Sequence, residues 1–255
     1  VLQVNTTAAA VSRTITVGAV TASLVVPKNT LRVQVGLLDD PAAITLFGQS
    51  LSGVVLFEQT RTAAGVKVVR MGFSDVSLFL GDAGDPGTTD DDTGLRLTGG
   101  GGVLLMLPTG FAGELTGTIA LVNLPVGVRT DLTLQVNTLG VAVNQTVSFT
   151  GVDGTPAGTR TLVLRKGPYL RIAASNIDIT IGSLALHGDI AFDRFGSGTA
   201  TVTRIAMANI SIGAGAVSGG PGVTGASGAL IVFGAGAVTV PAVGTTPAVR
   251  TATGG

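Results

Sequence analysis

The chain has 255 residues, of which 12% are charged, 4% are aromatic and 39 are glycine. Its 15 basic and 15 acidic side chains balance and form no basic patch, so the sequence argues against a nucleic-acid partner. The absence of cysteine excludes disulfides and thiolate metal ligands. The sequence contains no uninterrupted apolar run of about 18 residues, so we predict no membrane-spanning helix.

The first predicted strand begins the chain, and its sequence recurs. LQVNT occurs at Leu2–Thr6 and again at Leu134–Thr138. Apolar and polar residues alternate with a period of two after both copies, at Val11–Val17 and Val143–Phe149. This alternation is typical of a half-buried strand, because successive side chains of a strand point to opposite faces.

Later strand-like segments follow in the same order in both halves. The matched pairs are Leu31–Val33 with Leu170–Ile172, Leu51–Gln59 with Leu186–Arg194, Arg70–Leu78 with Arg204–Ile212, and Thr98–Met106 with Thr224–Val232. Glu114–Val122 has only a degraded counterpart at Val238–Val249. Ordered matches indicate a tandem repeat of about 130 residues. We predict unit 1 at residues 1–130, starting out of phase, and unit 2 at residues 131–255, incomplete at its C-terminal end.

The pattern predicts an all-β fold. No segment shows a sustained helical period, whereas Val, Thr and Ile favour strands and Gly and Pro punctuate about 14 to 18 short ones. We expect an elongated repeat architecture, either a β-solenoid or continuously stacked sheets. The alternative is a pair of tandem β-sandwich domains, although a sandwich unit of about 100 residues is shorter than this repeat.

The acidic segment Asp82–Gly94 is the best candidate metal site. Its carboxylates belong to Asp82, Asp85, Asp90, Asp91 and Asp92. Calcium prefers carboxylate and carbonyl oxygens on a flexible loop. The spacing matches neither an EF-hand nor a nonapeptide calcium repeat, and the matching segment Gly215–Gly225 has no acidic residue. A solvated acidic loop is the alternative, and we predict no other cofactor.

Catalytic motifs are missing from the sequence. His187, the single histidine, is matched by Ser52 in the other half, and alternation with Leu186 and Ile190 predicts an exposed strand residue. The glycine run Gly99–Gly102 lacks the Lys and Ser/Thr of a phosphate-binding loop, so it predicts a bulge or a tight strand start. We therefore expect no enzyme, no catalytic residues and no small-molecule substrate.

Four segments carry a resemblance to known proteins: LSGVVLFEQ, RMGFSDVSLFLGD, TGLRLTGGGGVLLMLPTGFAGELTGTIALV and LQVNTLGVAVNQT. Through them the chain resembles the tandem β-rich repeats of very large secreted bacterial surface proteins. The resemblance implies a structural segment of an extracellular fibre, surface layer or adhesin stalk, in which calcium is often held by Asp-rich loops. Its partners would be copies of itself or neighbouring repeats, joined through strand edges. An adhesin-type protein-binding module is the alternative function.

Overall fold

The computed structural model describes residues 1–46, 49–62, 64–82, 91–150, 156–214, 222–234, 237–240 and 248–251. Within these ranges the chain is all-β, which confirms the predicted class, and its one helical element is the three-residue 3-10 turn Gly198–Ala200. Several strands are longer than the alternation suggested; β7 (Lys67–Asp82) has 16 residues.

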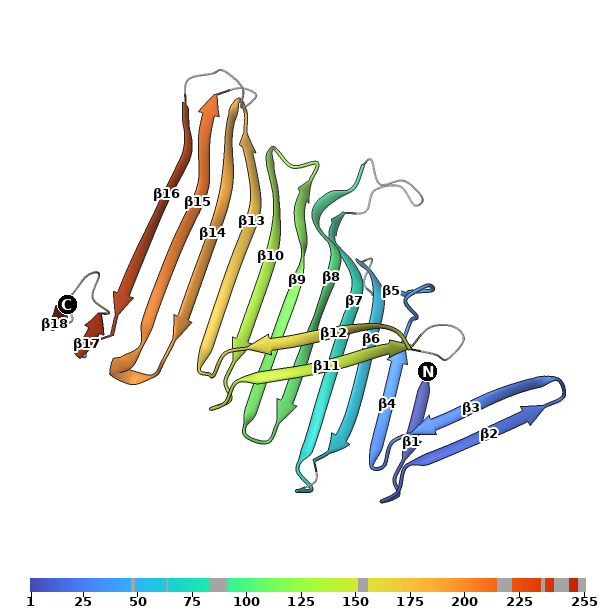
Figure 1. Cartoon of the computed structure of the whole chain (residues 1–255). Helices are drawn as coiled ribbons and strands as arrows, with labels where there is room; N and C mark the ends of the chain where they lie inside the picture. Colours follow the sequence, from blue (N-terminus) through green and yellow to red (C-terminus); the bar gives the residue numbers. More distant parts are fainter. Residues whose placement is uncertain are drawn as a thin grey trace.

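A single antiparallel sheet contains most of the strands (Figure 1). Its order is β1 (Leu2–Asn5), β4 (Thr30–Val35), β6 (Gln49–Arg61), β7, β8 (Thr93–Leu107), β9 (Gly110–Val122), β10 (Val126–Asn137), β13 (Tyr169–Ile181), β14 (Leu184–Phe195), β15 (Val202–Ala214) and β16 (Gly222–Phe233). β5 (Ala42–Leu46) also pairs with β6. β1 and β16 are therefore the two edges of the main sheet among the described residues.

Three hairpins lie outside the sheet order. They are β2 (Val11–Val17) with β3 (Val20–Val26), β11 (Val143–Thr150) with β12 (Pro156–Leu164), and β17 (Ala237–Val240) with β18 (Ala248–Thr251). The second hairpin, β11–β12, lies across one face of the sheet, whereas β2–β3 extends outward past the edge strand β1 (Figure 1). We call the side that carries β11–β12 the hairpin face, and the other side the open face.

The strand register makes the open face apolar across the sheet. Directly opposed residues share a face in an antiparallel sheet. One row of opposed positions on the open face runs through ten strands as Val35, Val55, Phe73, Gly102, Leu115, Leu134, Ile172, Phe192, Ile205 and Leu230. Several of these side chains are exposed, including Leu115, Ile172 and Leu230. The period-2 alternation is therefore present, but the apolar row that runs across all ten strands lies on the face that carries no hairpin.

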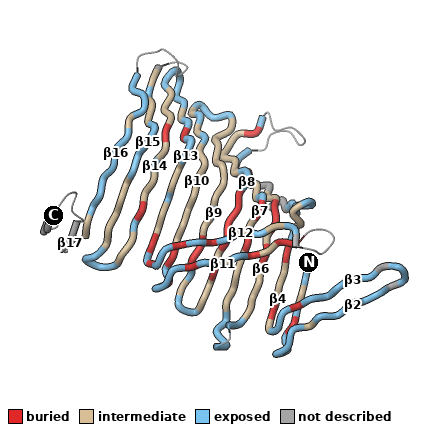
Figure 2. The backbone as a smooth tube through the Cα atoms, viewed as in Figure 1, coloured by how far each residue is buried: buried red, intermediate tan, exposed pale blue. Residues whose placement is uncertain are grey.

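The hydrophobic core lies between the sheet and the second hairpin. Buried residues (red in Figure 2) gather where β11–β12 crosses the strands. The hairpin contributes Val143, Val147, Phe149, Leu162 and Leu164, and the strands beneath contribute Val54, Leu56, Val103, Leu105 and Ala112. Burying such side chains stabilises the packing by roughly 1.5–3 kcal/mol each. The core therefore joins strands of the first half to a hairpin of the second.

Bulges interrupt the strands and recur in both halves. The register shifts on β7 beside Asp75 and on β15 beside Asn209, and both residues adopt a positive φ. On β8 the shift falls between Thr98 and Gly101, which confirms the bulge predicted for the glycine run. A bulge adds a residue to one strand and bends it. The repeat therefore extends to irregularities of the backbone.

Two carboxylates hold the bulged strands together. Asp131 Oδ1 accepts a hydrogen bond from Thr118 Oγ1 (2.6 Å), and its Oδ2 accepts one from Asn176 Nδ2 (2.9 Å). Asp189 accepts from the backbone N–H of Asn176 (3.0 Å) and from Asn209 Nδ2 (2.7 Å). These donors favour the charged form and lower the pKa of both carboxyl groups. The result is a polar ladder from β9 to β15.

Candidate functional site

An asparagine in each LQVNT copy fixes the base of the hairpin that follows it. Asn137 Nδ2 donates to the carbonyls of Val141 (2.9 Å) and Arg165 (2.7 Å), and its Oδ1 accepts from the N–H of Leu139 (2.9 Å). The side chain is fully buried. Because it contacts both ends of the hairpin, it closes the loop where the chain leaves β10 and returns to β13.

Asn5 makes the matching contacts in the first half. Its Nδ2 donates to the carbonyls of Ala9 (2.9 Å), Val26 (3.2 Å) and Pro27 (3.0 Å), and its Oδ1 accepts from the N–H of Thr7 (3.0 Å). Buried amides satisfied in this way specify one local geometry. The repeated LQVNT is therefore the signature of a repeated hairpin base. The division into residues 1–130 and 131–255 remains a prediction.

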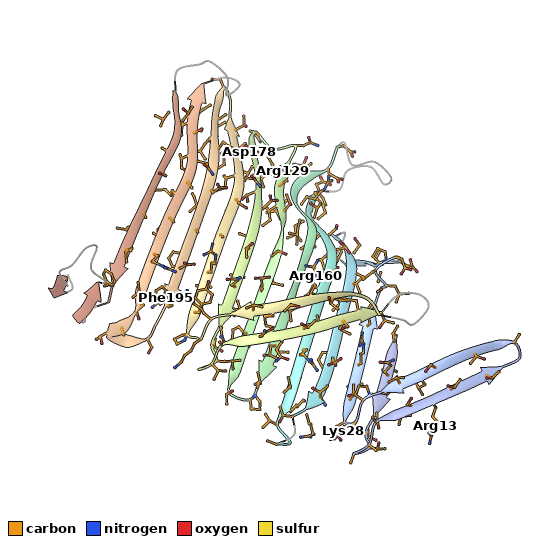
Figure 3. The ribbon with its side chains drawn as sticks, in the orientation of Figure 1. Arg13, Lys28, Arg129, Arg160, Asp178 and Phe195 are labelled. Atoms are coloured by element: carbon orange, nitrogen blue, oxygen red, sulfur yellow. The ribbon has the colours of Figure 1, made fainter. Side chains whose placement is uncertain are left out.

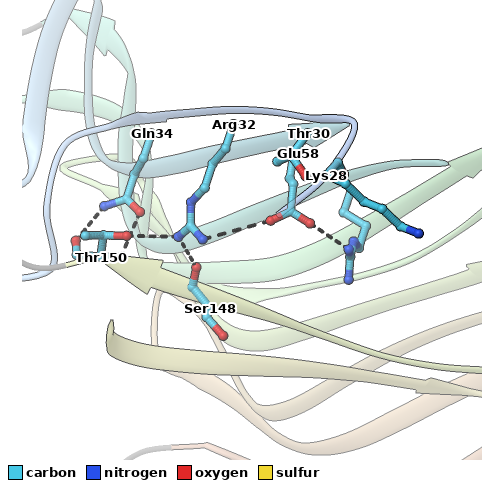
Figure 4. A network of polar contacts seen from close by, with 8 residues as sticks. Lys28, Thr30, Arg32, Gln34, Glu58, Ser148 and Thr150 are labelled. Atoms are coloured by element: carbon cyan, nitrogen blue, oxygen red, sulfur yellow. Dashed lines mark hydrogen bonds and ion pairs between the residues drawn. The ribbon is translucent and has the colours of Figure 1, made fainter. Parts of the chain in front are cut away.

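A cluster of charged residues links the sheet to the second hairpin (Figure 4). We call Arg32, Glu58 and Arg70 the first arginine clamp. Arg70 Nη2 lies 2.6 Å from Glu58 Oε1, and Arg32 Nη1 lies 3.9 Å from Glu58 Oε2. Arg32 also donates to the carbonyl of Ser148 and to Thr150 Oγ1 (3.0 Å) on the hairpin. Burial lowers the pKa of the Arg32 guanidinium, with Glu58 opposing that shift.

Gln34 completes the attachment of the hairpin. Its Nε2 donates to the carbonyl of Thr150 (2.6 Å), and its Oε1 accepts from the N–H of the same residue (2.9 Å). The side-chain amide thus pairs with the backbone at the end of β11. Arg32 and Gln34 together place this strand end over β4 and β6.

The second half repeats the clamp, and no hairpin of the described residues lies over it. We call Arg171, Asp193 and Arg204 the second arginine clamp; each lies at the position that the repeat alignment matches to the first. Asp193 accepts from Arg171 Nη1 (3.1 Å) and Arg204 Nη2 (2.8 Å). The Arg171 side chain is 38% exposed, against 15% for Arg32. The two arginines are therefore more exposed than those of the first clamp, whereas the Asp193 carboxylate between them is buried.

The two hairpins differ in the same way. Val147 and Leu162 are 4% and 0% exposed, whereas their counterparts Ile15 and Leu24 are 50% and 38% exposed. The outward side shows no such contrast, since Val163 and Val25 are 64% and 58% exposed. The difference is confined to the side that would meet a sheet, and it arises because β2–β3 extends beyond β1 (Figure 1).

Neither edge of the main sheet carries a charged or proline side chain that would oppose strand pairing, although β1 is only four residues long. β1 (LQVN) and β16 (GVTGASGALIVF) contain neither a charged residue nor a proline. Natural edge strands are generally shielded by Lys, Pro or a covering element. Leu2 and Val4 on β1 and Val223 and Leu230 on β16 are exposed. These edges and the uncovered hairpin are the candidate functional surfaces of the chain.

Only three of the five predicted calcium ligands, Asp82, Asp91 and Asp92, lie within the described residues. Asp85 and Asp90 lie outside the described residues, while Asp82 ends β7 and Asp91 precedes β8. Asp92 is buried and engaged: its Oδ2 lies 2.5 Å from Arg96 Nη2, and its carbonyl accepts from Asn123 Nδ2 (2.8 Å). Across the described part of the chain, no three His, Cys, Asp or Glu side chains gather as metal ligands. A calcium site in this segment remains a prediction.

His187 lies on β14 as a strand residue, and its side chain is 44% exposed. Its Nδ1 is 2.7 Å from Asp178 Oδ1. Ser211 is its register partner on β15, but the Ser211 hydroxyl accepts from the backbone N–H of Gly225 at 3.4 Å. The pair lies at the end of the sheet away from β11–β12, where Figure 3 labels Asp178. Its contacts are those of a cross-strand pair.

The arginine clamps and the two hairpin-base asparagines, Asn5 and Asn137, were not predicted from the sequence. A signal for them existed, because Arg–acid–Arg positions align between the halves of a chain with few charges. No protein-family model matches the chain, and neither curated proteins nor solved structures gave a match. No helix in the described ranges is long and apolar enough to cross a membrane.

Proposed function

We propose that the chain is a structural repeat segment of an extracellular fibre, surface layer or adhesin stalk, and that its units join end to end through β-strand edges. The observation that carries this proposal is the pair of unprotected edges, β1 and β16, at opposite ends of one sheet. An unpaired strand edge presents backbone donors and acceptors to another chain. A heterologous contact of this kind generates a filament when it does not close.

The internal repeat supports the same reading. β10 pairs with β9 in the middle of the sheet, and the repeat alignment matches β1 to the end of β10. β1 is therefore a strand whose counterpart has a neighbour on both sides. In a continuous assembly, a strand matching β9 would lie between β16 of one copy and β1 of the next, and residues 238–249 are the degraded counterpart of Glu114–Val122. This makes the extended architecture, built from one continuing sheet, preferable to two closed sandwiches.

The second candidate function is an adhesin-type protein-binding module. It is favoured by the open face, whose apolar rows are exposed across the main sheet. Apolar patches larger than a few hundred Å² mark interaction sites. Under this alternative the contact would be made by the face of the sheet, not by its edges.

Charge substitutions on one row of the open face separate the two functions. Leu230→Lys places a charge on the edge strand β16, and Ile172→Lys places one on the central strand β13 at the same row. Edge pairing predicts long particles for the unmodified chain in negative-stain electron microscopy. Leu230→Lys should abolish them, and Ile172→Lys should leave them intact.

The opposite pattern would support contact through the open face, and uniform single particles for the unmodified chain would refute end-to-end assembly. The same imaging with a chelator tests the acidic segment. Loss of long particles in chelator would assign a calcium role to the Asp82–Asp92 segment, whereas unchanged particles would leave it a solvated loop.

A further inference from the structure

We propose that hairpin β2–β3 docks on the hairpin face of β14, β15 and β16 of a second copy of this chain, in the way that β11–β12 packs on β6, β7 and β8 within one copy. This inference rests on the proposed function and names the contact that would position the joined edges. The repeat identifies the occupant. In the described residues, hairpin β11–β12 lies on sheet strands, the matching hairpin β2–β3 lies on none, and the matching strands β14 to β16 have no hairpin across them.

Hairpin β2–β3 carries apolar side chains at the positions that are buried in β11–β12. Its base is already formed, because Asn5 closes it as Asn137 closes the second hairpin. Val26 and Leu164, at matched positions beside the base, are both 3% exposed. Only farther along do the hairpins diverge, where Ile15 and Leu24 remain exposed. The hairpin is therefore preorganised, and docking would cover side chains that now face water.

The receiving surface is a row of small side chains. Within one copy, the row beneath β11–β12 is Leu56, Gly72 and Val103, paired in register and buried. A Cβ added at Gly72 would lie 2.8 Å from Phe149 Cζ and 3.0 Å from Val147 Cγ2, so this hairpin sits directly on the backbone.

The matching row in the second half consists of three alanines. Ala191, Ala206 and Ala229 are paired in register, and Ala206 and Ala229 are exposed. Because the three alanine side chains are equally small, they form a flat apolar surface on which a second hairpin can pack. Burial of the Ile15 and Leu24 side chains against it would supply the same kind of contact that Val147 and Leu162 make within the chain.

The second arginine clamp lies beside this row and adds a polar anchor. On the first clamp, Arg32 donates to the carbonyl of Ser148 at the end of β11. The hairpin alignment matches Ser148 to Thr16 on β2, and the repeat matches Arg32 to Arg171. We therefore expect Arg171 of one copy to donate to the Thr16 carbonyl of the next. Docking requires no acidic residue from the second copy, because Asp193 already forms ion pairs with both arginines of the clamp.

Geometry excludes docking within one copy. β2–β3 leaves the sheet at β1, and β14 to β16 form the other end of the strand order. At about 4.8 Å per strand, the span from β1 to β16 is roughly 48 Å. A seven-residue strand reaches only about 23 Å, which covers four or five strands of a neighbouring sheet. The hairpin can reach β14 to β16 only in another copy.

Cysteine pairs provide the test, because the chain has no cysteine of its own. Ile15→Cys is mixed with Ala206→Cys, and the two chains carry different size tags so that a mixed disulfide is recognised on a gel. Met207→Cys is the matched control, since its exposed side chain is the next residue along β15 and lies on the open face. We expect the Ile15–Ala206 disulfide at several times the yield of Ile15–Met207 after mild oxidation.

A second measurement uses no cysteine. Ile15→Asp should weaken self-association in light scattering by at least about a hundredfold, because docking would bury an unpaired charge. Val25→Asp, on the outward side of the same hairpin, should leave it unchanged. Hairpin docking would be overturned, and edge pairing kept, if the particles grow while the two disulfide yields are equal and Ile15→Asp has no effect. Single particles at every concentration, without a preferred disulfide, would overturn both proposals.

Discussion

The matched leucines of the two hairpins allow the covered and uncovered states to be compared directly. Leu162 is 0% exposed within the core, and its counterpart Leu24 is 38% exposed. Leu162→Ala should cost about 3 kcal/mol, because a buried leucine loses transfer free energy and leaves a cavity, together worth about 2–5 kcal/mol. Leu24→Ala leaves no closed cavity, since water reaches the site, so we expect a cost of roughly 1 kcal/mol or less.

The assay is urea unfolding at a concentration low enough to keep the chain monomeric. Tyr169 is the single tyrosine, the chain has no tryptophan, and this side chain lies in the core beside the hairpin base. Its fluorescence therefore reports on the packing of β11–β12. Equal costs for Leu162→Ala and Leu24→Ala would refute the argument that only the second hairpin is packed. An inverted order would place the stable core beneath β2–β3 instead.

Further predictions concern Asn137 at the hairpin base, the contact between Gly72 and hairpin β11–β12, and the carboxylates of Asp131 and Asp189. Asn137→Ala should lower the free energy of unfolding by about 3 kcal/mol in urea, because the buried side chain loses three hydrogen bonds at about 1 kcal/mol each. Gly72→Ala should cost about 1–3 kcal/mol by overpacking against Phe149, and Phe149→Leu in the same chain should recover part of it. The lowered pKa values of Asp131 and Asp189 mean that the unfolded chain binds protons more readily than the folded one. Their stabilisation should therefore be present above about pH 4 and decline as the pH falls through the lower folded pKa values; Asp131→Asn with Asp189→Asn should flatten this decline in pH-dependent unfolding.

The sequence predicted the strands better than their arrangement. Alternation identified β2 and β11 as strands, and the repeated segments coincide with matched strands of the sheet. It did not separate strands of the main sheet from strands of the crossing hairpins, because both alternate with a period of two. The hairpin base depends on one buried asparagine in each copy, and a single polar residue in a polar-rich segment gives no periodic signal.

The sequence also did not indicate which face of the sheet is covered by a hairpin. Residues such as Leu134 and Ile172 have the composition of a buried face, yet they line the open face, while the hairpin face carries Arg32, Glu58 and Gln34. Periodicity reports which residues share a face but not what lies on that face. The repeat aligns the Arg–acid–Arg positions of the two clamps, but only the strand register shows that the three residues of each clamp lie on adjacent strands.

The hydrophobic core does not respect the predicted repeat boundary near residue 131. Val54, Leu56 and Val103 come from before it, and Phe149 and Leu162 come from after it, yet all five belong to one buried cluster. The packing unit is thus one sheet segment together with the hairpin of the following repeat. The same offset accounts for β2–β3, which has no sheet strands beneath it in the described residues, and for β14 to β16, which have no hairpin across them there. The exposed side chains of β2–β3 and the more exposed arginines of the second clamp therefore share one structural origin.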